Sequence, residues 1–100
     1  MLVVGKDETQ IVNFDNVTSA YVSGRNAIKI NLKDGSGCQI AEYNTLEMAR
    51  EALNTLAEAA ARDARVFTFP GDEELHIRIQ ARAAKWHHAT GKKTKGHGGS

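Results

Sequence analysis

The residues best suited to chemistry lie in the last quarter of the sequence. No acidic residue occurs from Leu75 to Ser100, whereas six cationic residues do: Arg78, Arg82, Lys85, Lys92, Lys93 and Lys95. Spacings of four and three residues place the first three of them on one face of a helix. Because guanidinium and ammonium groups both bind phosphate oxygens, the segment predicts a phosphate-binding surface. The alternative is a solvated helix face with no ligand.

Aromatic and imidazole side chains accompany these cations. Trp86 or His88 can contact a nucleobase, the tryptophan by stacking on it. Alternatively, Trp86 is a buried anchor at a subunit contact. The predicted ligand-binding residues are therefore Arg78, Arg82, Lys85, Trp86, His88, Lys92, Lys93 and Lys95.

Other kinds of site find little support in the sequence. The four histidines have no cysteine or carboxylate at ligand spacing, so we predict no metal site and no cofactor. The stretch "GKKT" is not a phosphate-binding loop, because the position five residues before Gly91 holds Trp86 instead of glycine. Neither a nucleophile elbow nor a paired-carboxylate motif is present. We therefore expect a protein that is not an enzyme.

Length and composition limit the architecture. A chain of 100 residues forms one domain, and its net charge of +1 argues against a histone-like or DNA-mimicking protein. The single cysteine, Cys38, allows no internal disulfide, and the first residues do not have the pattern of a signal peptide. These features predict a cytoplasmic protein with one domain over residues 1–90. Residues 91–100 form a basic tail rich in glycine and lysine, whose alternative role is a solubilising terminus.

The fold class follows from a change in hydrophobic periodicity. Short β-forming segments joined by turns fit residues 2–4, 10–14, 17–23, 27–33 and 37–43. In the fourth segment Ile28, Ile30 and Leu32 alternate with polar residues, which is typical of a half-buried strand. Short connections indicate antiparallel neighbours. We therefore predict an α+β fold with an antiparallel meander of four to five strands.

Helical periodicity begins after residue 44. Asn44 and Glu47 form a potential capping box, and an apolar stripe follows at Leu46, Ala49, Leu53, Leu56, Ala57 and Ala60. This helix should cover the meander. Residues 65–69 then predict a return strand that ends at Pro70. A second helix should begin near Asp72 and end near Gly91, although the alternation in residues 75–80 also fits a strand.

A resemblance to known proteins rests on three stretches: "IVNFDNVTSAYVSG", "AEYNTLEMAREALNTLAEA" and "RVFTFP". They resemble short uncharacterised proteins of Firmicutes prophages and mobile elements, over roughly residues 1–70. The resemblance implies a sheet–helix fold and a phage setting, and it carries no active-site residues. By analogy of size and setting, it implies a role against bacterial defence.

Together these observations predict a homo-oligomeric binding protein without a membrane partner. Our first hypothesis is a phage-type protein that sequesters a cyclic or modified nucleotide immune signal. The alternative is an inhibitor that binds a defence complex, such as an anti-CRISPR. A small DNA- or RNA-binding protein is the third hypothesis, and the near-neutral total charge counts against it.

Overall fold

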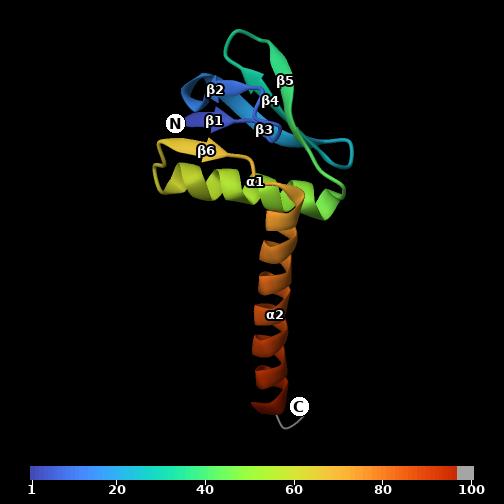
Figure 1. Ribbon diagram of the computed structural model, residues 1–100. Helices are drawn as coiled ribbons and strands as arrows, with labels where there is room; N and C mark the ends of the chain where they lie inside the picture. Colours follow the sequence, from blue (N-terminus) through green and yellow to red (C-terminus); the bar gives the residue numbers. More distant parts are fainter. Residues whose placement is uncertain (97–100) are drawn as a thin grey trace.

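The protein has an α+β fold, in which the β-strands gather at one end and the second of two α-helices projects away from them (Figure 1). The computed structural model describes residues 1–96, and it describes side chains as far as Ala84. In this range the elements are β1 (Leu2–Val4), β2 (Ile11–Asn13), a 3₁₀ turn η1 (Phe14–Asn16), β3 (Val17–Ser23), β4 (Ala27–Leu32), β5 (Gly37–Glu42), α1 (Leu46–Ala61), β6 (Val66–Thr68) and α2 (Asp72–Gly96).

The strands form two sheets of three strands each, in the orders β2–β1–β6 and β3–β4–β5. The prediction of a single meander of four to five strands was therefore wrong: the antiparallel meander contains only β3, β4 and β5. β1 pairs antiparallel with β2 and parallel with β6. The chain passes from one sheet to the other at η1, where the Asn13 side chain accepts a hydrogen bond from the Asp15 amide.

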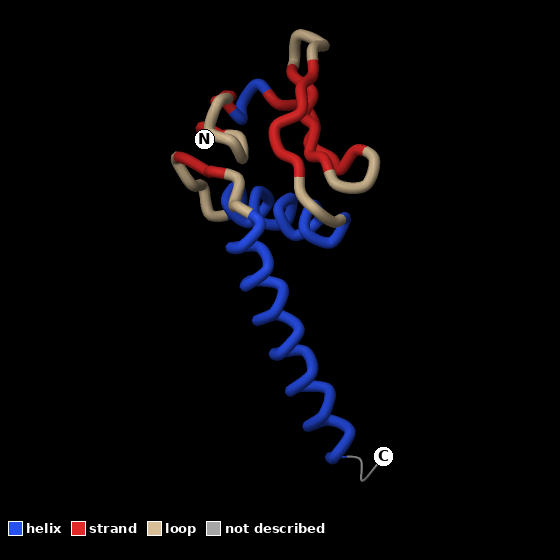
Figure 2. Tube along the Cα trace, turned by 45° about the vertical axis from the view of Figure 1, so that its right-hand side comes forward, coloured by secondary structure: helices blue, strands red, loops and turns tan. Residues whose placement is uncertain are grey.

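The core lies between the sheets and α1, which runs beneath both of them in two views (Figures 1 and 2). Ile28 and Ile30 of β4 face inward, as their alternation predicts, and Val3 and Phe67 fill the space under the other sheet. α1 contributes mostly small buried residues: Ala49, Ala52, Leu56 and Ala59. Because alanine has a short side chain, the helix can lie close to the strands.

The start of α1 differs from the prediction by one residue. Thr45 is the N-cap, and its hydroxyl accepts a hydrogen bond 3.0 Å long from the Met48 amide. The Asn44 side chain donates instead to the Asp72 carboxylate at 3.3 Å, so it connects the two helix starts. Threonine and asparagine are both good caps, and in this structure Thr45 caps the helix while Asn44 contacts a distant residue.

α2 is helical throughout residues 75–80, which decides between the helix and the strand for that stretch. Its 25 residues correspond to about 37 Å of helix. The helix continues past Gly91 to Gly96, so the predicted end near Gly91 was wrong, and the helix crosses the expected boundary between domain and tail. A single glycine costs a helix only about 1 kcal/mol relative to alanine. The principal extents of 57 × 27 × 21 Å reflect the projection of α2.

None of the helices that the structure describes is long and apolar enough to cross a membrane.

Candidate functional site

A buried carboxylate joins the two helices at the base of α2. Glu51 of α1 accepts a hydrogen bond from Arg78 Nε at 3.1 Å, and Arg78 Nη2 lies 3.0 Å from the same oxygen, Oε2. Arg82 Nη1 lies 3.1 Å from the other oxygen, Oε1. Because Arg78 and Arg82 are four residues apart on a helix, they share one face and can hold both oxygens of one carboxylate.

A second carboxylate supports Arg78. Its Nη2 also lies 3.2 Å from Oε1 of Glu58, which is on the same side of α1 as Glu51. Desolvation lowers the pKa of Arg78, but the hydrogen bond that Arg78 donates to Glu51 and the charges of Glu58 and Glu51 outweigh it and raise that pKa above its ordinary value. Arg78 and Arg82, which the sequence analysis placed among the ligand-binding residues, are thus both paired with carboxylates of α1.

Sequence reasoning missed Glu51 because it considered only cations and their neighbours on the same helix. A signal was nevertheless present in α1. Glu51, Thr55 and Glu58 follow one another at spacings of four and three residues, which makes a polar line beside the apolar stripe. Two members of that line, Glu51 and Thr55, are buried. The Thr55 hydroxyl donates to the Ala52 carbonyl of its own helix, whereas the buried Glu51 carboxylate requires a partner from another element.

The remaining predicted residues lie further along α2. The helix backbone passes through Lys85, Trp86, His88, Lys92, Lys93 and Lys95, and the side chains of these residues lie outside the described ones. We call residues 85–96 of α2 the basic segment. The basic segment begins about one turn after Arg82, and the helix axis advances about 20 Å from Arg82 to Lys95, so the outer lysines lie well beyond the last ion pair with α1. Figure 1 shows this part of α2 projecting away from the strands.

Charge is strongly segregated along α2. The first turn holds Asp72, Glu73 and Glu74, where the positive end of the helix dipole stabilises them. Every charged residue after Glu74 in the sequence is cationic. The two arginines nearest the domain bind carboxylates of α1, and the four lysines follow them toward the end of the helix. α2 therefore combines an anchored base with a basic outer half.

The start of α2 is held by a network of polar contacts. Lys6 Nζ lies 3.0 Å from Asp72 Oδ1, donates to the Glu42 carbonyl and sits 4.5 Å from the centre of the Tyr43 ring. The Tyr43 hydroxyl donates to the Pro70 carbonyl at 2.9 Å. Burial raises the pKa of Tyr43, and the negative charges of Asp72 and Glu74 add to that rise. These contacts, with buried Leu75, fix how α2 leaves the domain.

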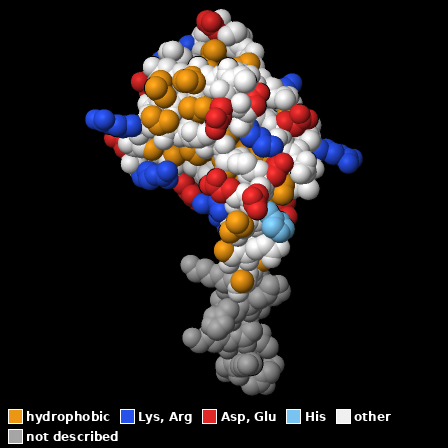
Figure 3. Space-filling view, viewed as in Figure 1, with side chains coloured by type: hydrophobic (Ala, Val, Ile, Leu, Met, Phe, Trp, Pro, Cys, Tyr) orange, Lys and Arg blue, Asp and Glu red, His pale blue; other side chains and the backbone are white. Residues whose placement is uncertain are grey.

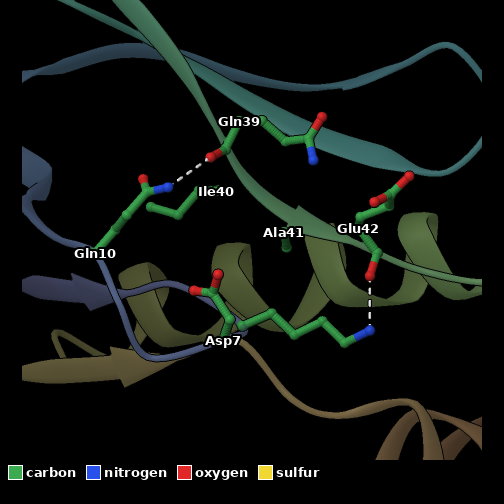
Figure 4. A pocket seen from close by; sticks show the side chains of 7 residues that line it. Asp7, Gln10, Gln39, Ile40, Ala41 and Glu42 are labelled. Carbon is green, nitrogen blue, oxygen red and sulfur yellow. Dashed lines mark hydrogen bonds between the residues drawn. The ribbon is translucent and has the colours of Figure 1, made fainter.

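A polar groove near this network lies between the β1–β2 turn and β5, with a volume of about 350 Å³ (Figure 4). Its lining includes Asp7, Gln10 and Glu42. The Gln10 side chain donates to the Gln39 carbonyl at 3.1 Å, and the Lys6 amide donates to the Ile40 carbonyl. The turn thus covers the edge of β5. We infer that the groove protects the edge of β5 from pairing with another strand, because the polar groups that line the groove bind one another.

Other candidate groups are isolated from one another. Among the residues whose side chains the structure describes, no group of three or more histidine, cysteine, aspartate or glutamate residues is placed to hold a metal ion. Cys38 is half-buried, with its Sγ 3.6 Å from Gln10 Oε1. His76 is exposed on α2.

Comparison with known proteins found no match: no protein-family model matches the chain, and neither a curated protein nor a solved structure matches it significantly. The resemblance to Firmicutes prophage proteins therefore stays a prediction from the sequence.

Proposed function

We propose that the chain is a non-enzymatic binding protein for a phosphate-bearing partner, and that the basic segment of α2 contacts the phosphates. The observation that carries this proposal is the charge distribution on a projecting helix. α2 leaves the domain at an anchored base, and no acidic residue follows Glu74 in the sequence. A basic stripe along one helix is the usual electrostatic footprint of a protein that binds polyanions.

The proposal divides the predicted binding residues into two groups. Arg78 and Arg82 hold Glu51, so a phosphate that used them would first have to break these ion pairs. They are assigned to anchoring the helix. The lysines of the basic segment, Lys85, Lys92, Lys93 and Lys95, are assigned to the phosphates, with Trp86 and His88 beside them.

The shape of the site favours an extended partner over a single nucleotide. Small ligands bind in concave pockets that cover most of their surface. A projecting helix is convex, and its dimensions fit the major groove of duplex DNA. We therefore place duplex nucleic acid first among the phosphate-bearing partners, ahead of the nucleotide signal that the sequence suggested. Sequestration of a nucleotide signal and inhibition of a bacterial defence complex stay predictions that use the same segment.

Thermal melting of the full chain against a panel of ligands tests the proposal. The panel holds duplex DNA, single-stranded RNA, cyclic di- and trinucleotides and cyclic ADP-ribose. A ligand that binds only the native state raises the melting temperature by mass action. We expect duplex DNA to raise it and Lys92→Ala/Lys93→Ala/Lys95→Ala to remove most of that rise.

A matched variant controls for charge alone. Arg25→Ala/Lys33→Ala/Arg50→Ala also removes three cationic groups, all of them exposed and none of them on α2. It should keep the rise in melting temperature. If only one cyclic nucleotide raises the melting temperature, and the lysine variant loses that rise, the partner of the basic segment is a nucleotide signal and not nucleic acid. If no ligand raises the melting temperature, or if both variants lose the rise equally, the proposal is wrong.

A further inference from the structure

The outer face of the β2–β1–β6 sheet carries large apolar side chains that nothing in the described chain covers. Alternation along the strands buries Val3 and Phe67 against the core. The neighbouring residues point the other way, and Leu2, Ile11 and Val66 are 46%, 65% and 55% exposed. Figure 3 shows hydrophobic side chains gathered over these three strands. Three of the six large apolar residues exposed in the described chain therefore share one small face.

The strand register arranges this face in a definite pattern. Leu2 lies beside Asn13 on one side and Val66 on the other, while Val4 lies between Ile11 and Thr68. The apolar residues thus form a continuous diagonal, which we call the apolar band: Ile11, Val4, Leu2 and Val66. Asn13 and Thr68 occupy the two opposite corners. None of these six residues is charged.

Other surfaces of the two sheets are less suited to apolar contacts. The outer face of β3–β4–β5 presents Tyr21 among polar residues, including Lys29, Asn31 and Gln39. The outer edge of β6 borders a groove of about 210 Å³, whose lining includes Glu58 and Arg62 from α1. The apolar band is therefore the surface whose contact with water is least favourable, and contiguous apolar patches of this kind mark interaction sites.

We infer that the apolar band docks against the apolar band of a second copy of this chain. An uncharged apolar surface selects a partner that is also apolar and uncharged at its centre, and a second copy presents the same surface. A two-fold axis lying along the band places band against band. The same axis brings Asn13 of one copy toward the Thr68 side of the other, so the polar corners also face each other. Such an isologous contact is the commonest symmetry of soluble oligomers.

The size of the face determines the strength of this dimer. Each strand contributes two outward-facing residues, whereas a stable interface buries about 800 Å² on each partner. Six side chains are far fewer than the roughly 20–30 residues on each side of a stable interface, so the contact is weak. Each copy buries Val3 and Phe67 without a partner, so the monomer keeps its own core. The contact therefore forms a dimer that depends on protein concentration.

Sedimentation of the full chain tests the inference over protein concentrations from about 1 μM to about 1 mM, a range that covers weak interfaces. The wild-type protein should shift from monomer to dimer across it. Ile11→Glu/Val66→Glu should raise the dissociation constant at least about tenfold, because it buries a carboxylate at each end of the apolar band. Ile77→Glu is the matched control, since Ile77 of α2 is 62% exposed and lies outside the band.

A second measurement needs no variant. On dilution of the wild-type protein, the amide NMR signals of β1, β2 and β6 should shift, and those of β3, β4 and β5 should stay. Circular dichroism establishes that each variant is folded. A protein that stays monomeric at every concentration overturns the inference. A dimer that Ile77→Glu abolishes, while Ile11→Glu/Val66→Glu leaves it intact, also overturns the inference. Dilution shifts confined to β3, β4 and β5 overturn it as well.

Discussion

Arg78 Nη2 lies 3.0 Å from Glu51 Oε2, and the Glu51 side chain at this contact is only 6% exposed. Arg82 binds the other oxygen of the same carboxylate, so one buried residue of α1 holds two consecutive turns of α2. The direction in which the basic segment leaves the domain depends on this carboxylate. The arginines that the sequence marks as ligand-binding residues are therefore structural partners of α1.

Removing the Glu51 carboxylate should lower the stability of the whole fold. In Glu51→Ala, both guanidinium groups lose their buried partner, and we expect a loss of about 1–3 kcal/mol in the free energy of unfolding. This lies below the range for fully buried pairs, because both arginines are partly exposed to water. Urea denaturation measures the loss. Glu58→Ala, at an exposed carboxylate, is the control and should cost less than about 1 kcal/mol. Equal losses in the two variants would contradict the role given to Glu51.

A variant of Arg78 should change the stability of the fold without changing the affinity for DNA. Arg78→Gln removes the contacts to both Glu51 and Glu58, and it should cost about 1–2 kcal/mol of stability. The same variant should bind duplex DNA as tightly as the wild-type protein, because the lysines of the basic segment are unchanged. Urea denaturation and fluorescence anisotropy with labelled DNA measure the two quantities. A variant that keeps its stability and loses its affinity would return Arg78 to the binding site.

Tyr43 should make stability fall at alkaline pH. Its buried hydroxyl donates to the Pro70 carbonyl, and burial raises its pKa above the ordinary value of 10. A folded state with the higher pKa favours the protonated phenol. The stabilisation of the fold by Tyr43 is therefore complete below about pH 10, and it is lost as the pH rises toward the pKa of Tyr43 in the folded state.

Tyr43→Phe tests this prediction. It should cost about 1 kcal/mol at neutral pH, because the Pro70 carbonyl loses its donor. Melting temperatures measured from about pH 8 to about pH 11 should then decline less steeply in the variant than in the wild-type protein. The exposed Tyr21 is present in both proteins and does not affect the comparison. Parallel declines would mean that another group causes the alkaline loss.

Gly5 marks the close approach of the β1–β2 turn to β5. A Cβ at this position would lie 3.0 Å from the Ile40 carbonyl oxygen, which belongs to the backbone and cannot move alone. Gly5→Ala should therefore cost about 1–3 kcal/mol in the free energy of unfolding, as overpacking does. Chemical denaturation checks this value. An unchanged stability would show that the turn can move away from β5.

Local sequence patterns predicted the elements well. The alternation of Ile28 and Ile30 identified β4, and the turns at Gly24 and Gly35 have the positive φ angles of 64° and 90° that favour glycine. Acidic residues after Asp72 located the start of α2. These signals act within a few residues, where propensity and capping decide the structure.

Pairing between distant segments was not predictable in the same way. β1 pairs with β6, more than sixty residues later, and three-residue strands carry too little pattern to choose a partner. Glu51 lies 27 residues from Arg78, so no spacing rule within a helix connects them. Tertiary contacts decide both features: the order of the strands in the two sheets, and the pairing of Arg78 and Arg82 with a carboxylate of α1.

The salt dependence of DNA binding tests the central claim most directly. Fluorescence anisotropy gives the affinity of the full chain for a labelled DNA duplex over a range of salt concentrations. On a log–log plot, the slope changes by about 0.9 for each phosphate contact. If the basic segment binds phosphates, Lys92→Ala/Lys93→Ala/Lys95→Ala should flatten the slope, by up to about 2.7 when all three lysines make contacts. Arg25→Ala/Lys33→Ala/Arg50→Ala should keep the wild-type slope. An equal slope in the wild-type protein and the lysine variant would contradict the account.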